Sequence, residues 1–246
     1  MAETMLAIEG FSLERQGPVF DEPVSVGAII GLAGLDGHGQ DEFLETLAGL
    51  RPPGQGLISK RTQAAMRPIG SFRAAAANGV VYLPRDRRTM GIFPNLSVYD
   101  NFAIASLKRD LKGLLISTHA RRQRYEKFRD QLSIVARDPD LPITGLSGGN
   151  QQKVLLARLL ARDPDVLLLN DPTRGVDVAT RQVLYSVFRQ LADDGMTLVV
   201  LSSEIEEAVM LCDRLLVFRE KQLAARLTGH DKTPERVIAA MFGRSS

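Results

Sequence analysis

The chain has 246 residues, of which 44% are hydrophobic and 24% charged, and its formal net charge at pH 7 is +2. This length allows one large domain with an inserted subdomain, and the small net charge argues against nucleic acid or anionic lipid as the main partner. The single cysteine, Cys212, excludes an internal disulfide framework, and no apolar run reaches the roughly twenty residues that span a bilayer.

The first predicted elements alternate strands with turns. Short apolar segments at 5–13 and around 23–33 are broken by glycine and proline, which predicts strands. The run 28–33 is continuously apolar, which favours a strand buried on both faces. The glycine-rich stretch 34–41 comes next. Apolar residues then recur at helical spacing: Phe43, Leu44 and Leu47. Strand, glycine loop and helix in this order predict a phosphate-binding loop.

The middle of the chain changes character after a further predicted strand at 79–83. From about 97 to 133 the pattern is helical and charge-rich without strand signals, so a helical subdomain inserted between two sheet strands is expected. Within it, the basic run 121–124 is expected to be a solvated helix face rather than a binding site.

The last part predicts a parallel sheet. Buried-strand patterns at 166–170 and 197–202 flank a helix with one apolar face: Leu184, Val187, Phe188 and Leu191. Alternating strands and helices imply a mostly parallel sheet with right-handed crossovers. A hairpin at 214–227 and a short helix capped by Thr233 are expected to complete the fold.

A Ser-Gly-Gly turn opens the helix predicted within 146–153. Such a turn exposes free backbone N–H groups at the positive end of the helix dipole, which suits a phosphate. A Ser-Gly-Gly turn alone is a common helix start. Its spacing to the strand at 166–170 and to the polar segment 171–177 favours a functional role.

The glycine loop departs from the phosphate-binding pattern G-x-x-x-x-G-K-[ST]. Gly34 and Gly39 fit the frame, but Gln40 stands at the lysine position and Asp41 at the hydroxyl position. The first change removes a positive charge and the second adds a negative one, so the local charge falls by two units where a polyanion should lie. One unit charge at about 4 Å is worth on the order of 4 kcal/mol at an effective dielectric of 20. A glycine turn that binds no ligand is the alternative interpretation.

From about Leu6 to Phe242 the chain resembles an ATP-binding domain of ABC transporters, and it is most similar to the second, degenerate ATPase half of simple-sugar importers of the ribose, galactose or xylose type. Four segments carry the resemblance: 82–87, 146–153, 173–178 and 202–204. It implies a P-loop NTPase fold of the α/β class, in which helices flank a mostly parallel sheet and an antiparallel β subdomain lies at the N-terminus. The expected division of the single domain 1–246 is a core of 1–91 and 146–246 and a helical subdomain of 92–145.

The resemblance assigns roles in the chain's own nucleotide site. Asp171 falls at the position of the glutamate that positions the attacking water, and Ser203 at that of the switch histidine. The own site comprises Gly34, Leu35, Asp36, Gly37, His38, Gly39, Gln40, Asp41, Arg85 and Asn170. Asn170 replaces an aspartate of the metal shell, and this change and the one at Asp171 both weaken hydrolysis, although Asp41 could still bind Mg²⁺. Arg85 falls at the Q-loop position, usually glutamine, and cannot be an oxygen ligand of the metal. Phe11 and Phe20 are candidates for stacking on adenine, but core packing is the commoner fate of such residues.

In this family two ATPase units pair head to tail, so a chain's signature turn completes its partner's site. The signature group is Leu146, Ser147, Gly148, Gly149, Asn150 and Gln151, and the D-loop is Gly175, Val176 and Asp177. These groups are intact, whereas the chain's own site is altered.

The resemblance therefore implies an importer component for a simple sugar or related small solute, with ATP and Mg²⁺ as cofactors. Its expected partners are a more conventional ATPase, membrane permease subunits and, indirectly, a solute-binding protein, with no nucleic acid. The expected location is cytoplasmic, at the inner face of the plasma membrane through permease contacts around 85–101. A scaffold without a nucleotide role, a non-transport ABC ATPase acting on DNA or ribosomes, and a conventional ATPase that tolerates its substitutions remain open.

Overall fold

A computed structural model describes residues 3–112 and 115–244, which form two compact units. The first unit contains the chain up to Tyr82, Asp165–Asp171 and the chain from Arg189 onward. The second contains Leu83–Pro164 and Pro172–Phe188, and the predicted helical subdomain 92–145 lies within it. The second unit is larger than 92–145 because helix α5 (Gly148–Leu160) packs against α3 (Val98–Ala103) and α4 (Thr118–Gln131).

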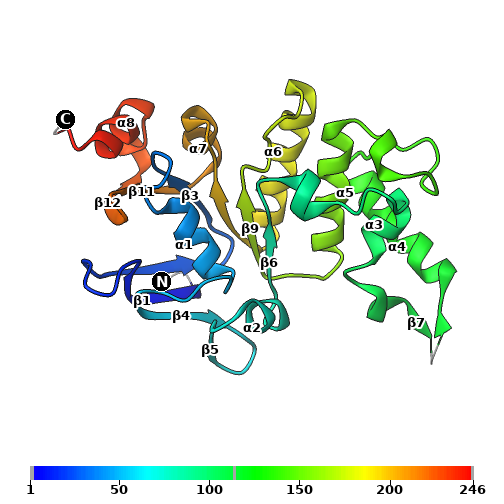
Figure 1. Ribbon diagram of the computed structural model, residues 1–246, viewed down its shortest axis with the longest axis horizontal. Helices are drawn as coiled ribbons and strands as arrows, with labels where there is room; N and C mark the ends of the chain where they lie inside the picture. The colour runs from blue at the N-terminus through cyan, green and yellow to red at the C-terminus, as the bar shows by residue number, and fades with distance from the viewer. Residues whose placement is uncertain (1–2, 113–114, 245–246) are drawn as a thin grey trace. The chain divides into compact units, whose positions relative to one another are not determined.

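A six-stranded sheet forms the centre of the first unit (Figure 1). Its strands, in spatial order, are β12 (Gln222–Thr228), β11 (Arg214–Arg219), β3 (Ile29–Ala33), β10 (Thr197–Leu201), β9 (Val166–Asn170) and β6 (Val80–Leu83). Strands β11, β3, β10 and β9 run parallel, and β12 closes one edge as an antiparallel hairpin. Every residue of β3, β9 and β10 is buried, which confirms the prediction that continuous apolar runs are strands covered on both faces.

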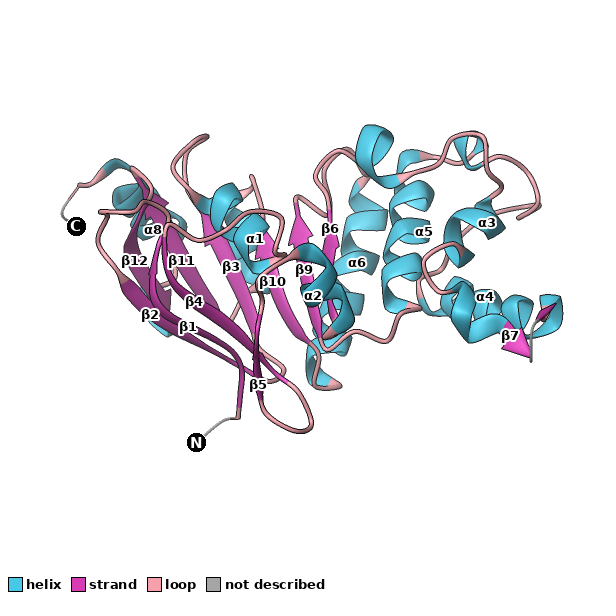
Figure 2. Cartoon of the chain, turned by 60° about the horizontal axis from the view of Figure 1, so that its bottom comes forward, coloured by secondary structure: helices cyan, strands magenta, loops and turns pink. Residues whose placement is uncertain are grey.

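An antiparallel sheet of four strands lies in the same unit, as the resemblance implied. Its spatial order is β2 (Phe20–Ser25), β1 (Thr4–Ser12), β4 (Gln55–Arg61) and β5 (Met66–Pro68). The sheet is followed by the short helix α2 (Phe72–Ala77), which Ser71 caps through its side chain. Figure 2 shows the strands of both sheets in magenta.

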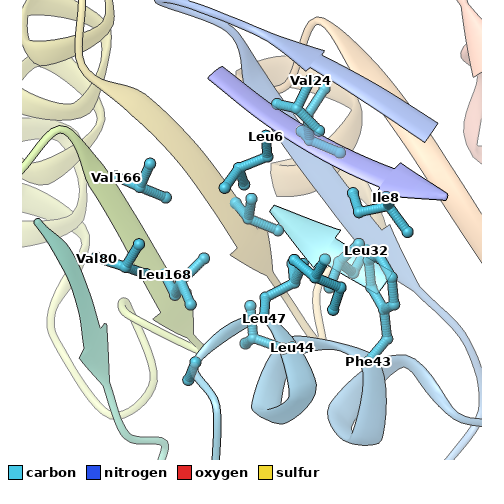
Figure 3. Packing of buried hydrophobic residues seen from close by; sticks show 14 of the residues in the cluster. Leu6, Ile8, Val24, Leu32, Phe43, Leu44, Leu47, Val80, Val166 and Leu168 are labelled. Carbon is cyan, nitrogen blue, oxygen red and sulfur yellow. The ribbon is translucent and has the colours of Figure 1, made fainter. Parts of the chain in front are cut away.

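The main hydrophobic core joins the two sheets to helix α1 (Gln40–Leu47). Leu44 and Leu47 of this helix pack with residues of β1, β3 and β9, as Figure 3 shows. Phe43 lies in an aromatic cluster, with its ring centroid 5.1 Å from those of Phe11 and Phe218. Phe11 is fully buried and Phe20 packs against it at 5.4 Å. Phe11 is therefore a core residue and Phe20 a partly buried one packed against the core, whereas stacking of either ring on adenine stays a prediction.

Cys212 follows α7 (Ile205–Leu211) and is a free thiol, 1% exposed. Burial raises the pKa of this thiol to about 12. Between about pH 9 and 12 the folded chain therefore keeps a proton that the unfolded chain has lost. The free energy of unfolding should consequently fall by up to about 1.4 kcal/mol per pH unit across this window.

A Cys212→Ala variant should lack this part of the pH dependence. The difference between wild type and variant, measured by urea unfolding at pH 8, 9, 10 and 11, isolates the thiol from lysines and tyrosines that titrate in the same range. At pH 8 the native thiol should also react with a thiol reagent roughly a thousandfold more slowly than in urea, because the thiolate is the reactive form. Equal rates in both states would contradict the burial of Cys212.

The second unit is largely helical. Besides α3, α4 and α5 it contains the π-helical turn η1 (Arg87–Gly91) and the 3-10 turns η2 (Leu107–Asp110) and η3 (Ile143–Gly145). The prediction that 97–133 lacks strands was wrong, because β7 (Leu111–Lys112) and β8 (Leu115–Ile116) pair in an antiparallel hairpin. Strands of two residues are too short to leave a period in the sequence.

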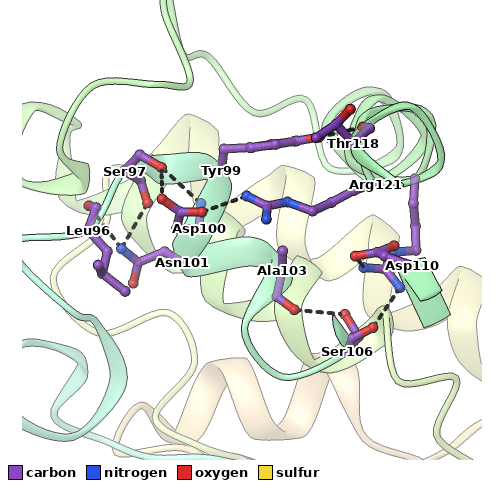
Figure 4. Close-up of polar contacts among 11 residues, drawn as sticks. Leu96, Ser97, Tyr99, Asp100, Asn101, Ala103, Ser106, Asp110, Thr118 and Arg121 are labelled. Carbon is purple, nitrogen blue, oxygen red and sulfur yellow. Dashed lines mark hydrogen bonds and ion pairs between the residues drawn. The ribbon is translucent and has the colours of Figure 1, made fainter. Parts of the chain in front are cut away.

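The basic run at 121–124 was also misjudged in part. Arg122 is an exposed side chain, but those of Arg121 and Arg124 are each only 15% exposed. Arg121 donates to Asp100 at 2.5 Å, and Arg124 donates to the buried Asp110 at 2.8 Å (Figure 4). Burial also lowers the pKa of Arg124. Two of the three arginines thus hold α4 to neighbouring segments, and the buried Asp110 requires a cationic partner.

The remaining elements match their predictions. Helix α6 (Val178–Asp193) buries the expected face, with Leu184 and Phe188 fully buried. The β11–β12 hairpin turns at Glu220 and Lys221, which both have positive φ. After the turn η4 (Gly229–Asp231), helix α8 (Pro234–Phe242) begins with Thr233 as its cap. Among the described residues, no helix is both long and apolar enough to cross a membrane.

Candidate functional site

The glycine loop 34–39 lies between β3 and α1, as the strand, loop and helix pattern predicted. Gly39 caps the helix in the left-handed region, with φ of 109°, and Gly37 has φ of 80°. A Cβ at Gly39 would lie 2.5 Å from Leu13 and 3.0 Å from the backbone of Lys221, so only glycine fits at this position. The loop therefore ends at a helix N-terminus, a place in a fold that suits a phosphate.

The side-chain amide of Gln40 points toward the glycine loop. Its side chain is 3% exposed and donates from Nε2 to the Leu35 carbonyl at 2.9 Å. A Cβ at Gly34 would lie 2.4 Å from the Gln40 Oε1, so the amide packs against the first two residues of the loop. A lysine ammonium would offer positive charge here, whereas the glutamine side chain is turned back onto its own backbone.

Asp41 and Asn170 meet at the end of β9. The Asn170 Nδ2 donates to Asp41 Oδ1 at 3.2 Å and to the hydroxyl of Tyr82 at 3.4 Å. Sequence reasoning assigned no role to Tyr82. Burial raises the pKa of this tyrosine, and the Asn170 bond opposes that shift. The three side chains form a polar cluster beside the glycine loop that supplies no cation.

Asp171 and Ser203 are in contact, as their predicted shared site requires. Asp171 is 4% exposed, has a φ of 46°, and accepts a hydrogen bond from the Ser203 backbone N–H at 2.6 Å. One carboxylate oxygen of Asp171 is thereby committed to the chain itself. The other carboxylate oxygen is not used in this bond, so the role of Asp171 in positioning water stays a prediction.

The residues beside the glycine loop offer few oxygen ligands for magnesium. Mg²⁺ prefers oxygen ligands in octahedral geometry. Asp41 and Asn170 offer oxygens, but the Asn170 amide already donates to Asp41. In the part of the chain that the structure describes, no group of three or more histidine, cysteine, aspartate or glutamate side chains could hold a metal ion. Nucleotide-bound Mg²⁺ needs only one or two protein carboxylates beside the phosphates, so a role for Asp41 at magnesium stays a prediction.

The signature turn is fully formed in the second unit. Ser147 caps α5, and its hydroxyl accepts from the backbone and side-chain nitrogens of Asn150 at 3.4 and 3.1 Å. The side-chain oxygen Oδ1 of Asn150 accepts from the Val135 N–H at 2.8 Å. Gln151 donates to the Leu146 carbonyl at 3.1 Å. These bonds fix the turn while Ser147 stays exposed.

The D-loop directly precedes helix α6. Asp177 accepts from the backbone N–H and hydroxyl of Thr180 at 2.9 and 2.8 Å, and these donors hold the pKa of Asp177 below its usual range. Thr180 in turn packs on the signature turn, because a Cβ at Gly149 would lie 2.8 Å from its hydroxyl. Arg87 donates to the Gly175 carbonyl at 3.5 Å. The sequence indicated no role for Thr180 or Arg87. Arg87 stood out only as part of segment 82–87, which carries the family resemblance.

The predicted site residues therefore fall into two groups. The glycine loop, Asn170, Asp171 and Ser203 lie together in the first unit. The signature turn and the D-loop lie together in the second unit. Arg85, half-buried in the bend after β6, also belongs to the second unit.

Comparison with protein families gives a match to "ABC transporter" over residues 21–174. Among relatives, the chain is 36% identical to "Ribose import ATP-binding protein RbsA 2" of Rubrobacter xylanophilus, over 98% of this chain and 46% of that protein. It is 38% identical to "Arabinose import ATP-binding protein AraG 2" of Burkholderia cenocepacia, over 93% of this chain and 45% of that protein. The chain thus spans less than half the length of these relatives.

Solved structures agree on the fold. An ATP-binding cassette of an ABC transporter in its ADP conformation superimposes with a TM-score of 0.78 at 15% identity, covering 98% of this chain and 96% of that chain. A dimeric ATP-binding cassette in a post-hydrolysis state, bound to ADP and phosphate, gives 0.75 at 19% identity, covering 91% and 98%. At these identities the likeness shows a common fold, which is the predicted P-loop NTPase architecture.

Proposed function

The chain belongs to the ABC transporter family, and on that premise we propose that it is an ATP-binding component of an importer whose intact signature turn completes the nucleotide site of a second ATPase. Its own site holds nucleotide weakly and does not hydrolyse it at a normal rate. The expected cofactors are ATP and Mg²⁺, with magnesium weak or absent at the chain's own site.

One contrast carries this proposal. In the chain's own site the Gln40 amide is bonded to Leu35, and Asn170 is bonded to Asp41, so no cation faces the glycine loop from either position. In the signature turn, Ser147 and Gly148 begin a thirteen-residue helix whose first N–H groups suit a phosphate. The groups that recognise phosphate are preserved where a partner would use them and altered where this chain would use them itself.

The printed names of the relatives suggest the transported class. Ribose, galactose and arabinose import appear among them, so we propose a simple sugar or a related small solute as the cargo. The further partners are membrane permease subunits and, through them, a solute-binding protein. The chain would act on the cytoplasmic side of the plasma membrane, with permease contacts around 85–101.

The isolated chain tests the proposal most directly. It should release phosphate from MgATP at least about a hundredfold more slowly than an assembly with a conventional ATPase, because both the lysine and the water-positioning glutamate are absent. Malachite-green phosphate assays of the isolated chain and of the assembly provide the comparison. Rapid hydrolysis by the isolated chain would favour a conventional ATPase instead, and calorimetry showing that the chain leaves the partner's ATP affinity unchanged would favour a scaffold.

A further inference from the structure

Arg87 is the first residue of the π-helical turn η1, and its guanidinium reaches the D-loop. Its Nη1 donates to the Arg174 carbonyl at 2.9 Å, and its Nη2 donates to the Gly175 carbonyl at 3.5 Å. Asp86 caps this turn by accepting from the Arg88 and Thr89 N–H groups, which fixes the direction in which Arg87 leaves the backbone. Burial lowers the pKa of Arg87. A half-buried guanidinium requires hydrogen-bond partners, and the carbonyls of Arg174 and Gly175 provide them.

The same guanidinium lies against the signature turn. A Cβ added at Gly148 would come within 2.5 Å of Arg87 Nη2 and 3.3 Å of the Gly175 carbonyl oxygen. A side chain at residue 148 would therefore have to displace the Arg87 guanidinium, and this constraint does not depend on nucleotide. The Arg87 guanidinium occupies the space that a side chain at residue 148 would need. The same guanidinium is hydrogen-bonded to the D-loop.

Thr180 makes a second contact between the same two segments. It packs on Gly149, and its hydroxyl and N–H groups are bonded to Asp177. Each glycine of the signature is thus packed from within by a residue that also contacts the D-loop. All of these residues belong to the second unit, so the arrangement is internal to one compact body.

We propose that Arg87 is a positioning residue that locks the D-loop to the signature turn, so that the two move as one piece when the partner's nucleotide is bound. This inference rests on the proposed function, because the signature matters to turnover only if it completes a partner's site. A guanidinium suits the task, since its planar donors reach two carbonyls in fixed directions, whereas a lysine ammonium on a flexible stem would not fix both.

Arg87→Met should lower the kcat of the assembled ATPase about tenfold or more, because small displacements of positioning groups cost that much in rate. The KM for ATP should change less than about threefold, because the backbone N–H groups that contact phosphate remain. Arg87→Lys should be intermediate. Arg122→Met, at an exposed arginine of α4 in the same unit, is the matched control and should leave both constants unchanged.

Hydrogen exchange in the isolated chain supplies a readout that does not depend on turnover. In Arg87→Met the amides of 174–177 should exchange faster, while those of β9 and β10 stay protected, which separates a local release from general unfolding. Unchanged exchange at 174–177, or kcat within twofold of wild type while Ser147→Asp in the same assembly is inactive, would overturn the role of Arg87. Full activity of Ser147→Asp would instead overturn the proposed function.

Discussion

Replacing Ser147 with aspartate should nearly abolish ATP hydrolysis by the assembled transporter, although the substitution is made in the chain whose own site is altered. Ser147 is exposed and caps α5, and aspartate is an equally good helix cap. The new carboxylate would face the γ-phosphate bound in the partner's site. Two like charges at about 4 Å repel by on the order of 4 kcal/mol at an effective dielectric of 20, which corresponds to roughly a thousandfold in rate.

Ser147→Asn is the matched control for this experiment. Asparagine has the same size as aspartate, caps a helix as well, and carries no charge. It should retain activity within about tenfold of wild type, so the difference between the two variants measures charge alone. Gly148 is a less suitable test position, because a side chain there would strike Arg87 before it could face a nucleotide. Substrate-dependent phosphate release from reconstituted assemblies gives the rates, and equal activity of both variants would refute the role of the signature in a partner's site.

Asp171→Asn in the same assembly completes the comparison. Asp171 already accepts the Ser203 N–H, and an asparagine oxygen could accept the same bond. Turnover should therefore change by less than about threefold, which is under 1 kcal/mol. A large loss in this variant would indicate that the chain's own site takes part in hydrolysis.

The sequence best predicted the features that depend on residues close together in the chain. Continuous apolar runs predicted β3, β9 and β10 with boundaries within one residue of those observed, because burial on both faces leaves a direct trace in residue type. The glycine loop and the Ser147 cap were also predictable, since each depends on a few neighbouring residues. The domain boundaries expected at 92 and 145 stay a prediction.

What the sequence could not reveal are contacts between distant residues. Arg121 and Asp100 are 21 positions apart, and Arg87 and Arg174 are 87 apart. From charge composition alone, the basic run 121–124 is expected to be a solvated surface. Only the folded chain shows that Arg121 and Arg124 have carboxylate partners. The same limit applies to Gln40, whose substitution was visible in the sequence while its bond to Leu35 was not.

Restoring the phosphate-binding pattern in the glycine loop should raise the affinity of the isolated chain for ATP. The double variant Gln40→Lys, Asp41→Thr adds one positive charge and removes one negative charge beside the nucleotide, and it removes one of the two partners of Asn170. We expect the dissociation constant to fall by at least about tenfold, which is well under the limit that two charges at about 4 Å would allow. A fluorescent ATP analogue titrated with and without Mg²⁺ measures this constant directly.

Gln40→Met separates charge from conformation in the same titration. Methionine has a similar length but cannot donate to the Leu35 carbonyl, so it frees the loop without adding charge. Its affinity should stay close to that of the wild type if the missing cation limits binding, and should approach that of the double variant if the Gln40–Leu35 bond is what closes the loop. The double variant should still hydrolyse ATP slowly, because Asn170 and Asp171 remain in place. Wild-type affinity equal to that of the double variant would show that backbone donors alone hold the triphosphate, and the chain's own site would then be occupied but inactive rather than weak.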